Sequence, residues 1–270
     1  MSLKVCQSAP APDHVRLFCD KIKKDCATVG LASPPDMVFT VEKRENLSMS
    51  EVHRIFLLSP ASVAGTRAAL LMGTSSELEM ARRLRGHGVP LGELFSFISG
   101  LYFRGKLAYA SAFSNAPEGV QGVFVITASG GLVPPDNAIT LDRLRQVTAG
   151  NLDSADMRYR APLERDAQLI VDRVGASSQI ILLGSIATPK YVDPLLNVFG
   201  AQLMFPAEFV GRGDMSRGGL MLRCVESGEQ LTYLSVIGAA RHGPKPPKLK
   251  PLPRKTLASS SRHAPIEALL

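Results

Sequence analysis

Short apolar runs alternate with helix-length segments along the middle of the chain. The runs are rich in residues that favour strands, and each stops on small residues or proline; they cover residues 54–60, 122–128, 179–183 and 201–205. The segments between them have the length and spacing of helices, at residues 66–85, 91–113, 141–149, 161–174 and 191–198. Strands that alternate with helices in this way predict right-handed crossovers and an α/β fold with a mostly parallel central sheet.

Two further apolar runs follow the last of these strands. Residues 220–225 and 230–236 flank the sequence Glu-Ser-Gly-Glu, which is typical of a turn. We therefore expect a hairpin that completes one edge of the sheet.

The same pattern divides the chain into three parts. We expect an N-terminal extension over residues 1–50, with a helix-like piece packed on the main domain, and the α/β domain over residues 51–238. Residues 239–270 are rich in proline, lysine and arginine and poor in apolar residues, which predicts an extended, disordered tail.

Composition supports one large domain and changes how the charge is interpreted. The chain is 45% apolar but only 6% aromatic and has no Trp, so its core must consist mainly of aliphatic side chains, as in a parallel sheet covered by helices. The net charge is +7, and most of this excess comes from seven lysines and arginines at residues 241–262, in a stretch without an acidic residue. The high isoelectric point therefore describes the tail and not a basic face of the domain.

Several functional classes lack their sequence signals. The four cysteines form no Cys-x-x-Cys pair and lie near no histidine at zinc spacing, so we expect no disulfide framework, no metal and no cofactor. The N-terminus does not resemble an export signal, and no apolar run is long enough to span a membrane. We expect a cytoplasmic protein with reduced thiols and no membrane partner.

The loops that follow the predicted strands carry the candidate chemistry. Ligands of open parallel sheets bind at the carboxyl ends of the strands, where neighbouring crossovers diverge. Hydroxyls and unhindered backbone N–H groups there suit phosphate, ribose or base edges. The alternative is that these small residues only permit tight turns. The candidates in these loops are Ser59, Ser129, Gly130, Gly131, Gly184 and Ser185.

Residues 211–219 form the loop with the most glycine. Four glycines free its backbone, two arginines can bind phosphate or carboxylate, and one acid lies among them. The loop matches neither a P-loop nor a dinucleotide-binding turn, and an ordinary turn is the alternative. Its candidate ligand-binding residues are Gly211, Arg212, Gly213, Ser216 and Arg217, with Asp214 as a candidate base.

Aromatic and basic residues lie close together at residues 99–109. Tyr102 and Arg104 provide the planes that base recognition uses, although the aromatics can equally anchor a helix in the core. The histidines fall outside the small-residue loops, so Ser-His and Cys-His catalysis is not indicated. A carboxylate would have to act as the base, and Asp136 and Asp214 are the candidates, with capping or surface ion pairing as the alternative role.

The order of these segments resembles a known family. Leu58-Ser-Pro-Ala61, Leu101-Tyr-Phe-Arg-Gly105, the stretch Ile126 to Asp136 (Ile-Thr-Ala-Ser-Gly-Gly-Leu-Val-Pro-Pro-Asp) and Gly184 with Lys190-Tyr-Val192 are similar to the peroxide-stress protein YaaA and related bacterial proteins. The third stretch is also similar to one in the accessory domain of archaeosine synthase. The resemblance implies a three-layer α/β fold of the uracil-DNA-glycosylase kind. It also implies a pocket faced by Ser59, Ser129, Asp136, Gly184, Tyr191 and Arg212.

Three functions remain open from the sequence. The first is recognition of a nucleotide or nucleobase, with hydrolase or glycosidase activity on a nucleotide or nucleic-acid base. The second is non-catalytic binding of DNA or RNA, in which the basic tail supplies affinity for the phosphate backbone. The third is an interaction module whose tail docks on a protein partner.

Overall fold

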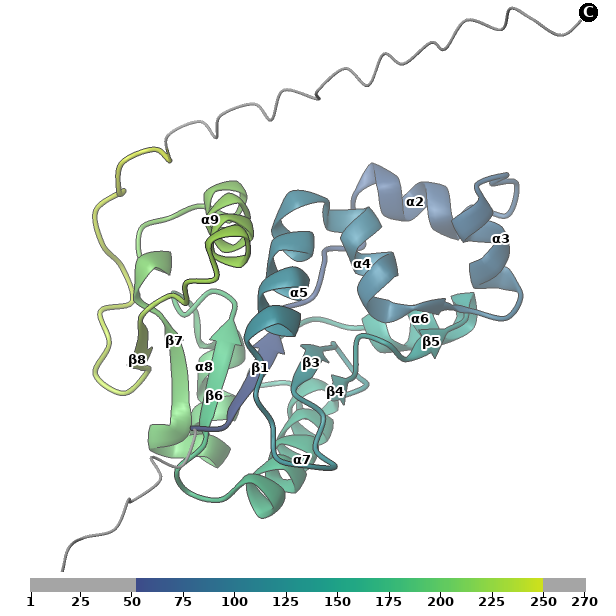
Figure 1. The fold of residues 1–270 in the computed structure, drawn as a ribbon. Coiled ribbons are helices and arrows are strands. Elements are labelled where there is room, and N and C mark those ends of the chain that lie inside the picture. Colours follow the sequence, from purple (N-terminus) through teal and green to yellow (C-terminus); the bar gives the residue numbers. More distant parts are fainter. Residues whose placement is uncertain (1–51, 250–270) are drawn as a thin grey trace, which may run out of the picture. The chain divides into compact units, whose positions relative to one another are not determined.

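A mostly parallel sheet forms the centre of the molecule in the computed structural model, which describes residues 52–249. Its parallel strands are β3 (Val123–Ile126), β1 (Arg54–Leu58), β6 (Gln179–Leu183) and β7 (Leu203–Pro206), side by side in that order (Figure 1). The predicted α/β class and parallel sheet are confirmed. The expected N-terminal extension and most of the tail lie outside the described residues.

Short antiparallel strands close both edges of this sheet. β4 (Leu132–Val133) pairs with β3, and β8 (Tyr233–Ser235) pairs with β7, which gives the order β4-β3-β1-β6-β7-β8. A separate two-stranded sheet pairs β2 (Val89–Pro90) with β5 (Ala138–Ile139). Residues 239–249 contain no helix or strand.

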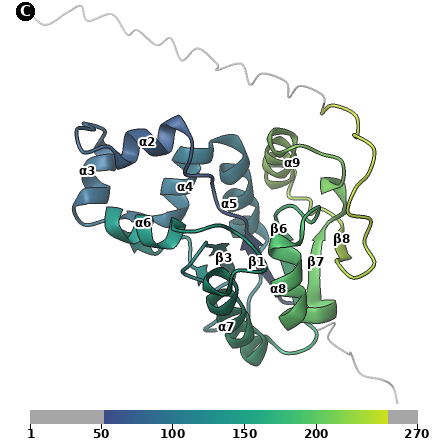
Figure 2. The same cartoon turned by 180° about the vertical axis from the view of Figure 1, so that it is seen from behind.

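Helices connect the strands and cover both faces of the sheet, as Figures 1 and 2 show from opposite sides. None of the helices between residues 52 and 249 is long and apolar enough to cross a membrane. The α-helices are α2 (Thr66–Met72), α3 (Glu79–Arg85), α4 (Leu91–Ser99), α5 (Leu101–Phe113), α6 (Leu141–Thr148), α7 (Met157–Val174), α8 (Pro189–Phe199) and α9 (Asp214–Ser227). Two short 3₁₀ turns, Gly200–Gln202 and Ala207–Phe209, flank β7.

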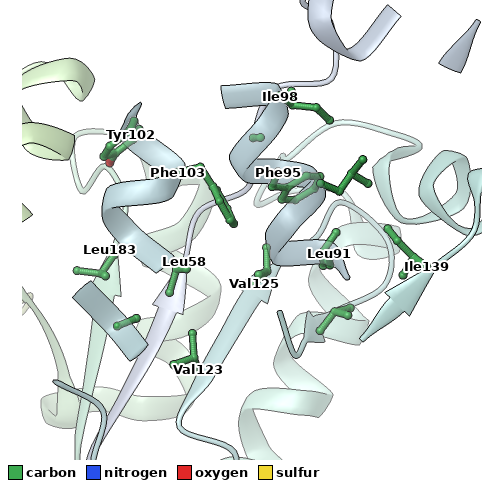
Figure 3. Close-up of a cluster of buried hydrophobic side chains, with 14 of the residues drawn as sticks. Leu58, Leu91, Phe95, Ile98, Tyr102, Phe103, Val123, Val125, Ile139 and Leu183 are labelled. Carbon is green, nitrogen blue, oxygen red and sulfur yellow. The ribbon is translucent and has the colours of Figure 1, made fainter. Parts of the chain in front are cut away.

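The central strand β1 contributes to two hydrophobic cores. Successive side chains of a strand point to opposite faces of the sheet. Phe56 and Leu58 accordingly pack with α2 to α6 and α9, and Figure 3 shows Leu58 in this cluster with Phe95 and Phe103. Ile55 and Leu57 pack on the other face with α7 and α8. A strand buried on both faces is a continuous apolar run, which explains why its position was predictable.

Two segments expected to be single helices are each broken into two. Gly100, with a φ of 63°, ends α4 and begins α5 within residues 91–113. Glycine adopts this left-handed conformation without the steric penalty that a side chain would bring. Residues 66–85 likewise form α2 and α3, with an intervening turn.

The predicted hairpin is wrong in its first half. Residues 220–225 lie inside α9 rather than in a strand, and only the second run provides a strand, β8. The buried residues Gly218, Met221 and Cys224 recur at every third position, which is a helical spacing. Gly228 then ends the helix in a left-handed conformation with a φ of 73°. The predicted glycine loop is therefore a loop only as far as Gly213.

Candidate functional site

A cleft of about 570 Å³ lies where β1, β3 and β6 end. Its walls combine loops from these strands with side chains of α4, α5 and α8, the C-terminal part of α6 and the start of α9. This is the edge at which open parallel sheets bind ligands. The lining residues are Ser59, Pro60, Ala61, Ser62, Val63, Ala64, Phe95, Ser99, Tyr102, Thr127, Ala128, Val147, Thr148, Gly150, Asn151, Leu152, Ser185, Lys190, Tyr191 and Asp214.

A buried lysine supports the floor of the cleft. Lys106 on α5 is 1% exposed, and its ammonium donates hydrogen bonds to the carbonyl oxygen and the Oγ of Ser59, the latter at 2.8 Å. The Ser59 hydroxyl also lies 3.3 Å from the carbonyl oxygen of Leu183, to which it can donate. Ser59 is thus held from two sides at the point where β1 enters the cleft.

The surroundings of Lys106 are apolar and aromatic. Its Nζ lies 4.4 Å from the ring centroid of Tyr102 and 4.9 Å from that of Phe103. Burial lowers the pKa of Lys106 to about 7, while the carboxylate of Asp214 acts to raise it and the guanidinium of Arg217 to lower it further. A substantial fraction of this amine is therefore neutral near physiological pH.

Two tyrosines from different helices contribute aromatic rings to the cleft. Tyr102 comes from α5 and Tyr191 from α8, and both are buried along most of their length. Burial raises the pKa of both phenols, so both stay protonated as donors. The Tyr102 hydroxyl has no hydrogen-bond partner among the described residues, which is unusual for a buried polar atom.

Charged groups lie at the rim of the cleft. The Lys190 ammonium lies 4.9 Å from the ring centroid of Tyr191. Asp214, at the first position of α9, has a side chain that is 66% exposed, and its Oδ1 lies 3.6 Å from the Arg217 guanidinium. An ammonium beside an aromatic ring provides adjacent contacts for an anionic group and a planar ring.

Some of the residues predicted from sequence meet at this cleft. Ser59, Tyr102, Ser185, Tyr191 and Asp214 line it together. Gly184 does not line it but lies under it: a Cβ at Gly184 would lie 3.2 Å from the Cβ of Ser59. The glycine allows β6 to end close against the Ser59 side chain.

Two glycines of residues 211–219, Gly211 and Gly218, have packing roles. Gly211 has a φ of 70°, and a Cβ there would collide with the carbonyl oxygen of Pro244. A Cβ on Gly218 would lie 2.8 Å from the carbonyl oxygen of Leu101, because α9 packs against α5. Gly213 is the residue that precedes the first turn of α9. None of the three lines the cleft.

The two arginines of this segment are occupied by the protein itself. Arg212 donates hydrogen bonds to the carbonyl oxygen of Glu208 and to Oγ of Ser216. Arg217 donates twice to the carbonyl oxygen of Phe209 and lies over its ring. The structure thus places Arg212, Ser216 and Arg217 outside the cleft lining, with roles in holding the start of α9.

The turn between β3 and β4 is organised around Thr127. Its Oγ1 donates to the carbonyl oxygen of Gly131 at 3.0 Å and accepts from the N–H of Gly130 at 2.9 Å. Ser129 Oγ donates to the carbonyl oxygen of Gln146. Thr127 and Ala128 line the cleft, whereas Ser129, Gly130 and Gly131 shape the turn behind them.

Two other candidates lie elsewhere. Asp136 is exposed in the turn between β4 and β5 and does not line the cleft. Arg104 lies at a second hollow of about 430 Å³, which it lines together with Arg67 and Gly100. The structure therefore brings only Asp214 of the two candidate bases to the cleft.

Sequence reasoning missed Lys106, Thr127 and Lys190. A signal for Lys106 was present, because it falls four residues after Tyr102 and three before Tyr109 on the buried side of α5. A lysine at such a position requires either a polar partner or a function. Thr127 and Lys190 lie close in sequence to the predicted residues Ser129 and Tyr191, so their place in the sequence was the available signal.

Within residues 52–249, no group of three or more His, Cys, Asp and Glu side chains could hold a metal ion. Cys224 is a buried free thiol on α9, outside the cleft lining.

Comparison with models of protein families, with curated proteins and with solved structures found no match to this chain.

Proposed function

We propose that the cleft binds a nucleoside or nucleotide. The supporting observation is a cleft of about 570 Å³ that combines two tyrosines with hydroxyl, amide and ammonium groups. Sites for small molecules generally have volumes of about 300–1,000 Å³, with mainly apolar walls and a few polar groups. A nucleoside has the corresponding chemistry, a flat ring with polar edges joined to a polyhydroxylated sugar.

The polar groups of the cleft are distributed in a way that suits the parts of such a ligand. Lys190 beside Tyr191 offers a cation for phosphate next to an aromatic surface for a base. Asn151 offers both a donor and an acceptor for a base edge or a ribose. Tyr102 adds an aromatic ring to the wall of the cleft.

The resemblance to YaaA-like proteins supports the same conclusion and the finer fold description. We propose that the three-layer arrangement is of the uracil-DNA-glycosylase kind. Two of the resembling segments, which contain Ser59 and Thr127, line the cleft together, and Tyr191 joins them from a third. Hydrophobic cores on both sides of the sheet are consistent with this fold.

The geometry favours recognition over a glycosidase reaction that uses two carboxylates. Such a reaction needs a pair of acids facing one ligand. Of the described acidic residues, Asp214 alone lines the cleft, and it is largely exposed at the rim. Any hydrolysis in this cleft must therefore rely on other groups.

Nucleic-acid binding through the tail is a second candidate function. Arg241, Lys245 and Lys248 are all exposed in the described part of the tail, where proline and glycine separate them. Exposed basic residues on an extended segment bind a phosphate backbone in a salt-dependent manner.

Thermal-shift and calorimetric titrations of the full chain with bases, nucleosides and nucleoside monophosphates test the first candidate. We expect binding that is lost in Tyr191→Leu, which keeps an apolar side chain but removes the ring and the hydroxyl. A matched variant, with Arg241, Lys245 and Lys248 changed to Gln, should bind nucleosides normally. The absence of binding by any compound in the set would overturn the proposal.

The same two variants test the second candidate by fluorescence anisotropy with single-stranded and double-stranded oligonucleotides. The tail variant should lose affinity and show a shallower salt dependence, whereas Tyr191→Leu should retain both. Equal oligonucleotide binding by the tail variant and the unchanged protein would exclude the tail as the binding element.

A further inference from the structure

Ser59 and Lys106 have the arrangement of a nucleophile and its base. The Nζ of Lys106 lies 2.8 Å from the Oγ of Ser59, and Ser59 itself lines the cleft. A serine hydroxyl is a weak nucleophile until a neighbouring base takes its proton, and hydrogen-bond contact between the two groups is the geometric requirement. Lys106 does not itself line the cleft, so its amine comes close to a bound ligand only beside the Ser59 Oγ.

The surroundings of Lys106 favour a neutral amine. No carboxylate lies within ion-pair distance of its Nζ in the part of the chain that the structure describes. The groups that influence its charge are Asp214 and Arg217 on α9, whose effects oppose each other, while burial lowers its pKa to about 7. A neutral amine can accept the Ser59 proton, and the resulting ammonium can return it.

A purely structural role explains these contacts less well. An apolar side chain of similar length would fill the same space without the penalty of burying an amine. Lys106 instead directs its hydrogen bonds to one residue, Ser59, through both the carbonyl oxygen and the Oγ. This residue is the one at which the central strand meets the cleft.

We propose that Ser59 is a catalytic nucleophile and Lys106 its general base, and that the cleft hydrolyses an ester or amide by acyl transfer. Ser59 Oγ forms a bond to the carbonyl carbon as its proton passes to the Lys106 amine. The bond from that carbon to the leaving oxygen or nitrogen breaks, and the leaving group takes the proton from Lys106. Water then attacks the acyl carbon, gives a proton to Lys106 and releases the acid, and Ser59 regains its proton.

Tyr102 completes the arrangement as a donor. Its hydroxyl lies near Ser59 and the Arg217 guanidinium, and burial raises its pKa, so it stays protonated. A protonated phenol beside the nucleophile can donate to the oxygen that becomes negative during attack. Neither this donor nor the Ser59–Lys106 pair requires the ligand to be a nucleoside. A failure of nucleoside binding would therefore not contradict the proposed roles of Ser59 and Lys106, which are tested by a separate experiment.

A fluorophosphonate probe tests the pair on the full chain. Its phosphorus forms a bond to the attacking serine oxygen, the P–F bond breaks and fluoride leaves, so intact mass and peptide mapping identify the labelled residue. We expect a single adduct on Ser59 and none in Ser59→Ala. Ser178→Ala is the matched control, because Ser178 is also a buried serine, donates to the Val174 carbonyl oxygen and does not line the cleft.

Variants of Lys106 and the pH dependence of the labelling rate distinguish a general base from a residue that only holds Ser59 in place. Lys106→Met should label at least about 100-fold more slowly at pH 8, the lower range for loss of a general base. Lys106→Arg, which keeps the charge but cannot accept the proton, should be impaired to a similar extent. The labelling rate of the unchanged protein should rise with pH through a midpoint near 7.

The pH profile requires no substitution, so it remains decisive where a lysine variant fails to fold. Absence of an adduct on Ser59 in the folded protein would overturn the proposal. So would a rate independent of pH between about 6 and 8, or a folded Lys106→Met that labels as fast as the unchanged protein.

Discussion

Gly105 on α5 and Gly218 on α9 face each other so closely that a Cβ on Gly105 would lie 2.7 Å from the carbonyl oxygen of Gly218. The reverse contact is equally tight, with a Cβ on Gly218 2.8 Å from the carbonyl oxygen of Leu101. The two helices therefore meet backbone to backbone. This contact places Tyr102 and Lys106 of α5 next to Asp214 and Arg217 of α9, and so assembles one side of the cleft.

Gly105→Ala should destabilise the protein, because the added methyl group meets backbone atoms that cannot move independently of α9. We expect a loss of about 1–3 kcal/mol in the free energy of unfolding, measured by urea denaturation. Gly219→Ala is the control, since a Cβ there would meet only the Leu249 side chain at 3.6 Å. Helix propensity should make that variant neutral or slightly more stable. Equal effects of the two variants would contradict the close contact of the helices.

The stability of the protein should depend on pH through Lys106. Its pKa falls from 10.5 to about 7 on folding, so between these values the unfolded chain binds a proton that the folded protein does not. Stability should therefore rise as pH increases above about 7, by at most roughly 1.4 kcal/mol per pH unit from this group. Urea denaturation from about pH 7 to about pH 9, below the range where tyrosines titrate, measures the slope. Lys106→Met should remove this component, and an unchanged slope in that variant would contradict the burial effect.

Thr127→Val should loosen the turn between β3 and β4 while preserving the shape of the side chain. The substitution removes one donor to the Gly131 carbonyl oxygen and one acceptor from the Gly130 N–H. We expect a loss of about 1–3 kcal/mol in the free energy of unfolding and faster amide exchange at Gly130. Thr148 provides a comparison, since its hydroxyl donates only within α6, to the Leu144 carbonyl oxygen. Thr148→Val should have the smaller effect.

Tyr109 and Tyr233 connect α5 to the edge strand β8, with their hydroxyl oxygens 2.6 Å apart. The Tyr109 hydroxyl also accepts the buried N–H of Leu231 at 2.8 Å. Tyr233→Phe should therefore lower the free energy of unfolding by about 1 kcal/mol. Tyr109→Phe should lower it more, because this variant also leaves the buried N–H of Leu231 without its acceptor. Thermal denaturation of the two variants gives the order. The reverse order would show that Leu231 does not depend on this hydroxyl.

Residues buried on both faces of the sheet were the most predictable from sequence. Residues 55–58 and 180–183 are uninterrupted apolar runs, and both lie in the paired central strands β1 and β6. Edge elements were less predictable. The pattern of residues 220–225 fits a strand as well as a helix, and in the structure this segment is part of α9, which packs against α5 at Gly218.

The sequence also indicated the edge of the sheet at which the cleft lies, because parallel strands that end in small residues direct their loops to one side. It could not indicate which of those residues face the cleft. Gly211 and Gly131 look alike as ligand contacts in the sequence, yet a Cβ on the first would meet Pro244 and on the second Asp166. The reason for each glycine lies in a partner distant in sequence.

By itself, the sequence determined the α/β class, the order of the central strands along the chain and the presence of Ser59 and Ser185 near their carboxyl ends, because these follow from local hydrophobic patterns. Only the tertiary structure decided that Lys106 reaches Ser59, 47 residues earlier in the chain, and that Asp214 but not Asp136 lies at the cleft. Such pairings depend on how α5 and α9 pack against the end of β1. Packing between distant segments leaves no periodic signal in the chain.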